Sequence, residues 1–181
     1  RIVFASDRRA SGLDIWEVDL KTGLEWRISS RAGDELDPAW SADGRDLVYI
    51  HRDGETWSLV LRRHGQPEEI LVSGNERLAG PSWRPDGSLI MVWRETDEGA
   101  VLDMIILSQP RLVRRYMDGE DYSIVPVSWL DRHRLYYSAD GLIRQRLFNA
   151  WSSKTVPFRA TITSPDEPVV ALVRRSLPRI D

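Results

Sequence analysis

Apolar residues in this chain gather in short runs separated by turn-forming residues. Leu47-Val48-Tyr49-Ile50 and Leu89-Ile90-Met91-Val92 are clear examples. The runs are rich in β-branched and aromatic residues, which favour strands. Asp-Gly, a dipeptide that accepts the positive φ angles of tight hairpin turns, occurs five times. No window carries apolar residues at the i, i+3, i+4, i+7 spacing of an amphipathic helix. The pattern therefore predicts an all-β protein of short, hairpin-linked strands.

A longer repeat runs through these strands. Pro38-Ala39-Trp40-Ser41-Ala42-Asp43-Gly44 recurs as Pro81-Ser82-Trp83-Arg84-Pro85-Asp86-Gly87, and the second tryptophan follows the first by 43 positions. A weaker copy places Trp129 46 residues after Trp83. A period of about 40–45 residues with β-rich units is typical of propeller blades. We therefore predict an all-β propeller, small or partial, built from about four four-stranded blades of 40–46 residues.

Each repeat divides into strands at its turns. The expected strands of one complete repeat are Leu36–Trp40, Asp46–Ile50, Thr56–Arg62 and Glu68–Val72. The next two repeats give Ala79–Trp83, Ser88–Trp93, Leu102–Leu107 and Arg111–Tyr116, then Ile124–Trp129, Arg134–Ser138, Leu142–Leu147 and Lys154–Arg159. The opening segment supplies only three strands, Ile2–Ser6, Asp14–Leu20 and Glu25–Ser29.

The first blade thus lacks a strand, and two explanations stay open. Ala160–Thr163 is a candidate closing strand that would pair with the opening segment and hide its edge. Alternatively, the chain is part of a larger ring. We assign propeller blades to residues 1–158, and a closing strand or a linker toward a following domain to residues 159–181.

Composition excludes several classes of partner. The net charge is −3, with 25 basic and 28 acidic residues interspersed. Without a basic stripe, nucleic acid is not an expected partner. No apolar run approaches the roughly 18–20 residues that span a bilayer, so we expect no membrane insertion. The absence of cysteine excludes disulfides, thiolate zinc sites and a cysteine nucleophile.

The chain contains no recognisable catalytic constellation. The Gly-x-Ser-x-Gly elbow of serine hydrolases does not occur. His51, His64 and His133 are far apart in sequence and form no metal-binding pair. We therefore predict no catalytic residue, no cofactor and no metal ligand in these residues. Whether the chain belongs to an enzyme is left open.

Acidic residues form the candidate binding site. They lie just before or within the expected innermost strands, which approach the channel mouth of a propeller, where carboxylates could bind a cation or a basic peptide. The favoured alternative is that they accept backbone N–H bonds and order the turns. The candidates are Asp34, Glu35, Asp37, Glu120 and Asp121.

The eight tryptophans divide into three sets. Trp16 and Trp57 share a register on the third strand of the repeat and are expected to be structural. Three share one register of the repeat and are expected to pack between blades: Trp40, Trp83 and Trp129. Three others fall outside that register and are the candidates for an exposed surface that meets another domain or protein: Trp26, Trp93 and Trp151.

The run Asp37-Pro38-Ala39-Trp40-Ser41-Ala42-Asp43-Gly44-Arg45 resembles the repeat of TolB-type propellers, as does Phe4-Ala5-Ser6-Asp7-Arg8 followed by Asp14-Ile15-Trp16. The resemblance covers residues 1 to about 150 and is strongest in the first half. Three groups carry such repeats: the periplasmic TolB protein, which is a partner of outer-membrane lipoproteins, propeller-gated serine peptidases, and bacterial amidohydrolases with a metal-dependent barrel. Ile143–Phe148 and Val156–Thr161 are similar to the propeller end of the third group.

The resemblance implies a function that is structural rather than catalytic. We expect a non-catalytic module that binds a protein partner or packs against an adjacent catalytic domain. The alternative is the propeller portion of a larger hydrolase, an amidohydrolase or a serine peptidase, with catalytic residues outside this chain. The implied location is the bacterial periplasm or the outside of the cell, with the cytoplasm left open.

Overall fold

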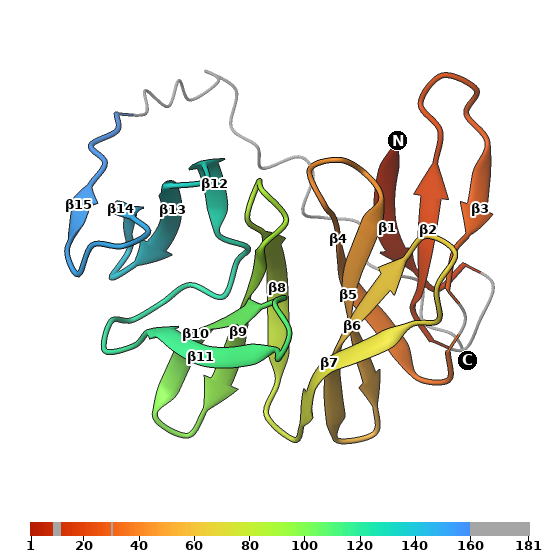
Figure 1. Cartoon of the computed structure of the whole chain (residues 1–181), viewed down its shortest axis with the longest axis horizontal. Coiled ribbons are helices and arrows are strands. Elements are labelled where there is room, and N and C mark those ends of the chain that lie inside the picture. The colour runs from red at the N-terminus through yellow and green to blue at the C-terminus, as the bar shows by residue number, and fades with distance from the viewer. Residues whose placement is uncertain (9–11, 30, 160–181) are drawn as a thin grey trace, which may run out of the picture.

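The computed structural model describes residues 1–8, 12–29 and 31–159, whose strands form four antiparallel sheets arranged in an arc (Figure 1). The first sheet has three strands in the order β1-β2-β3. The other three have four strands each, ordered β4-β5-β6-β7, β11-β10-β9-β8 and β12-β13-β14-β15. Each sheet is a meander of strands consecutive in the chain, as in a propeller blade. The predicted all-β propeller is confirmed.

The strands of the first sheet are β1 (Ile2–Ser6), β2 (Asp14–Val18) and β3 (Glu25–Arg27). Those of the second are β4 (Asp34–Trp40), β5 (Asp46–Asp53), β6 (Thr56–Arg63) and β7 (Glu69–Gly74). The third contains β8 (Leu78–Trp83), β9 (Leu89–Thr96), β10 (Gly99–Ile106) and β11 (Leu112–Met117). The fourth contains β12 (Ser128–Asp131), β13 (Arg134–Ala139), β14 (Leu142–Leu147) and β15 (Ser153–Thr155).

The strand predictions are accurate in the first three sheets and less so in the fourth. The predicted strand at 124–129 shifts to β12, which begins at Ser128. Pro126 explains the shift, because proline has no N–H to donate to a ladder. Before β12, the chain keeps only an isolated bridge between Tyr122 and Ala139.

The core consists of layers between adjacent sheets, and the central sheets are buried on both faces. Leu47 and Tyr49 of β5 pack toward the first sheet, whereas Val48 and Ile50 pack toward the third. The side chains of β9 alternate in the same way, with one set packing toward the second sheet and the other toward the fourth. Successive side chains of a strand point to opposite faces, so a strand buried on both faces reads as a continuous apolar run. This explains the apolar runs seen in the sequence.

The first and fourth sheets lie at opposite ends of the arc (Figure 1). In the fourth sheet, Leu135 and Tyr137 face the third sheet. Ile143 pairs with Ser138, so its side chain lies on the other face, where it is 37% exposed. The predicted closing strand Ala160–Thr163 lies outside the described residues. Ring closure and the domain division at residue 159 therefore stay predictions.

Candidate functional site

The carboxylates of β4 connect the second sheet to its neighbours. Asp37 has a φ of 47°, and its Oδ2 accepts a hydrogen bond from the Gly80 N–H of β8 at 2.9 Å. Asp34 Oδ1 accepts one from the Leu13 N–H, beside the first sheet, at 3.0 Å. Gly80 itself has a φ of 56°, and a Cβ there would lie 2.9 Å from the Pro126 nitrogen, so glycine lets the chain before β12 approach β8 closely. Asp34 and Asp37 thus accept backbone N–H bonds, but the donors lie beside or in neighbouring sheets and not in the turns next to the two carboxylates.

Glu35, a candidate for binding at the channel mouth, lies in the interior of the protein. Its side chain is fully buried between the first and second sheets. It accepts hydrogen bonds from the Ser29 hydroxyl and from the Arg31 N–H, the latter at 3.3 Å. Burial raises the pKa of the Glu35 carboxyl, and these two hydrogen bonds oppose the rise. Glu35 is therefore unavailable to a ligand in solvent, because sheet packing encloses it.

Replacing Glu35 with glutamine should increase the stability of the variant relative to the wild type as the pH rises. Because the pKa of Glu35 is raised in the folded protein, folding favours its protonated form. That contribution to stability is fully present below the pKa of the unfolded chain, and it is lost as the pH rises through the higher folded pKa. Urea unfolding at several pH values measures the free energy of unfolding of both proteins. The difference between them should change in favour of Glu35→Gln as the pH rises from the unfolded pKa to the folded pKa of Glu35. A difference independent of pH would contradict this assignment.

Glu120 and Asp121 precede the fourth sheet. The Asp121 N–H donates to Asp140 Oδ1 at 3.2 Å, and the Asp121 carbonyl accepts from the Asp140 N–H at 2.8 Å. Glu120 is half-buried, and its buried Oε2 has no hydrogen-bond partner among the described residues. Within those same residues, no hydrogen bond or ion pair joins this pair to the β4 carboxylates. Binding by Asp34, Asp37, Glu120 and Asp121 stays a prediction.

The three tryptophans proposed for an interface occupy different environments. Trp93 is fully buried between the third and fourth sheets, and its indole N–H donates to the Val125 carbonyl at 2.5 Å. Its predicted exposure is therefore wrong. Trp26 is 39% exposed and Trp151 is 97% exposed. The interface role of these two stays a prediction.

The recurring tryptophans pack between sheets as expected. Trp83 is buried in the layer between the second and third sheets, and its indole N–H donates to the Ala39 carbonyl at 3.0 Å. Trp40 and Trp129 are half-buried and pack against the layers on either side of it. The predicted inter-blade position of these residues is confirmed.

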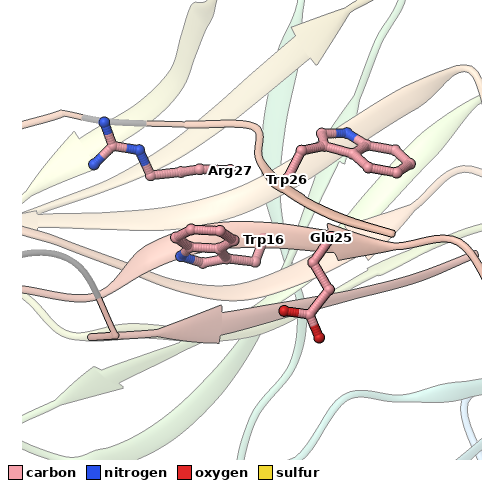
Figure 2. A pocket seen from close by; sticks show the side chains of 4 residues that line it. All are labelled: Trp16, Glu25, Trp26 and Arg27. Carbon is pink, nitrogen blue, oxygen red and sulfur yellow. The ribbon is translucent and has the colours of Figure 1, made fainter. Parts of the chain in front are cut away.

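Two hollows involve Trp26. The first, of about 390 Å³, is formed by Trp16 on β2 and by Glu25, Trp26 and Arg27 on β3. Figure 2 shows the Trp26 indole pointing away from the Glu25 carboxylate that precedes it. The second, of about 210 Å³, lies between the first and second sheets and brings Trp26 together with Arg62 and His64. The sequence alone does not indicate this groove, since its residues come from distant segments.

Comparison with known proteins supports the fold. No family model matches the chain. TolB from Acinetobacter baumannii superposes with a TM-score of 0.74 and 16% identity, covering 87% of this chain and 41% of that chain. A putative TolB from Agrobacterium tumefaciens gives 0.71 and 14% identity, over 84% of this chain and 59% of that one. The described part of the chain therefore has the TolB-type β-propeller fold, which confirms the resemblance seen in the sequence.

Peptidases also appear among the similar proteins. A puromycin-hydrolysing peptidase from Mycobacterium tuberculosis superposes with a TM-score of 0.61 and 16% identity, over 88% of this chain and 31% of that chain. The uncharacterised peptidase YuxL of Bacillus subtilis is 32% identical over 94 residues, which are 50% of this chain and 14% of the relative. This chain thus spans only a minor part of both peptidases.

In the described ranges, no helix has the length and apolarity needed to cross a membrane.

Proposed function

We propose that this chain is a non-catalytic propeller module that binds protein through the outer face of its fourth sheet. The observation that carries the proposal is the exposure of two apolar side chains, Ile143 and Leu147, on this otherwise polar face. Leu147 pairs with Arg134, one residue before Leu135, so it lies on the same outward face as Ile143. Leu147 is 56% exposed, and Trp151, just after β14, is almost fully exposed. Exposed apolar side chains that cluster are typical of surfaces that meet another protein.

A photo-crosslinking experiment tests this function. The full-length polypeptide is expressed with p-benzoylphenylalanine in place of Leu147 and, as a control, in place of Glu55, which is exposed in the β5–β6 turn. We expect position 147 to crosslink to protein outside these 181 residues and position 55 to give no such product. Crosslinks that stay within the 181 residues, or equal products at both positions, would exclude the proposed surface.

A second candidate function is the propeller portion of a larger hydrolase. The likeness to YuxL and to the mycobacterial peptidase favours a peptidase over the metal-dependent amidohydrolase that the sequence also suggested. The propeller-gated peptidases that the repeat resembles would supply a serine nucleophile. A fluorophosphonate probe should then label the full-length polypeptide at a serine outside residues 1–181. Absence of labelling would exclude the serine peptidase. The resemblance to TolB supports a location in the periplasm for the module.

A further inference from the structure

The groove between the first and second sheets has an unusual combination of side chains. Its apolar floor includes Leu47 and Trp40, and Trp26 stands at its edge. Both flanking sheets belong to the described part of the chain. Its volume of about 210 Å³ suits one or two side chains rather than a folded domain.

The charges around this floor are mostly positive. Three arginines, Arg1, Arg45 and Arg62, line the groove, and Glu17 is the one acidic residue among the described residues that line it. Glu17 is already neutralised, since its Oε1 lies 2.9 Å from Arg1 Nη1 and its side chain is 2% exposed. The groove therefore carries a surplus of positive charge.

Arg62 is the most available of these cations. Arg1 is held by Glu17 and by the Trp40 ring, whose centroid lies 5.4 Å from the guanidinium carbon. Arg45 lies 3.8 Å from Asp43, and both side chains are largely exposed. Arg62 is half-buried and has no ion pair with any described residue. Its pairing with Leu47 across the β5–β6 ladder places it over the apolar floor.

We propose that this groove binds an acidic peptide segment of a partner protein. An apolar side chain of the segment packs against Trp26 and Trp40, and a neighbouring carboxylate pairs with Arg62. Arginine suits this role because its planar guanidinium can bind a carboxylate through two hydrogen bonds. The positive charge attracts an acidic segment and disfavours a basic one. The inference rests on the proposed function as a protein-binding module and names one partner chemistry for it.

Fluorescence anisotropy with a short fluorescein-labelled peptide of alternating leucine and aspartate tests the proposal. The acidic peptide should bind, its affinity should fall when salt is raised to about 0.5 M, and the same peptide with lysine in place of aspartate should not bind. Arg62→Glu should weaken binding about tenfold. Arg114→Glu is the matched control, because this substitution changes the net charge by the same amount. Arg114 is exposed on β11 in the third sheet, outside the groove.

Trp26→Ala provides a second variant at a partly exposed position and should weaken binding about fivefold through lost apolar contact. Circular dichroism verifies that each variant is folded. The proposal is overturned if the acidic peptide does not bind, if both peptides bind equally, or if Arg62→Glu and Arg114→Glu have the same effect. Crosslinking at position 147 tests the fourth sheet, whereas the peptide tests the groove between the first and second sheets. A negative result for one proposal is therefore distinguishable from a negative result for the other.

Discussion

Replacing Trp83 with alanine should lower the free energy of unfolding by about 4 kcal/mol. Trp83 is buried between the second and third sheets, where it packs with Val48, Ile50 and Ile90. Its removal leaves a cavity in the layer that joins the two central blades. It also deprives the Ala39 carbonyl of its indole donor. Both losses occur at one interface, so the two sheets should separate more readily.

Urea unfolding followed by circular dichroism measures this effect. Trp83→Phe is the matched variant, since it keeps an aromatic ring in the layer but removes the N–H that donates to Ala39. We expect it to cost about 1–2 kcal/mol. If alanine at this position cost less than phenylalanine, or if neither changed the midpoint, Trp83 would not join the sheets.

Replacing Trp93 with alanine should have a similarly large effect, about 4 kcal/mol. The side chain is fully buried on the other face of the third sheet, among Met91, Leu135 and Tyr137. Its ring centroid lies 5.1 Å from that of Tyr122, and its N–H bonds to the Val125 carbonyl. Trp93 therefore attaches the connection before β12 to the third sheet as well as filling the layer.

Trp151→Ala is the control for this substitution. Both changes remove an indole, but Trp151 is almost fully exposed, so its loss should change the unfolding free energy by less than about 0.5 kcal/mol. Chemical denaturation of the two variants side by side provides the comparison. Equal effects would contradict the burial assigned to Trp93.

The sequence allowed the strands and the blade repeat to be predicted because their signals are local. Asp43-Gly44 and Asp86-Gly87 define hairpin turns, and the apolar runs after them form β5 and β9. Trp93 was misassigned because the repeat register was given more weight than the run to which it belongs. Leu89, Met91 and Trp93 alternate within that run and share one face. The alternation was therefore a signal for burial of Trp93.

The environment of Glu35 and the existence of the groove could not be predicted in this way. The burial of Glu35 depends on its contact with Ser29 and on the packing of the first sheet against the second. The positions of acidic residues in the sequence carry no information about either contact. The groove brings together Arg1, which precedes β1 of the first sheet, and Arg62 on β6 of the second. Both features arise from the packing of blades against one another. Periodicity identifies the blades but does not give the side chains that meet between them.

The layered packing also sets the order in which parts of the described arc can open. A central sheet shares two buried layers with its neighbours, whereas in the described residues an end sheet shares one. In linear arrays of repeats, stability is roughly a sum of the intrinsic stability of each unit and its nearest-neighbour contacts. Detaching an end sheet therefore disrupts a single buried interface, whereas detaching a central sheet disrupts two. Fluctuations that expose backbone amides should begin at the ends and reach β5 and β9 last.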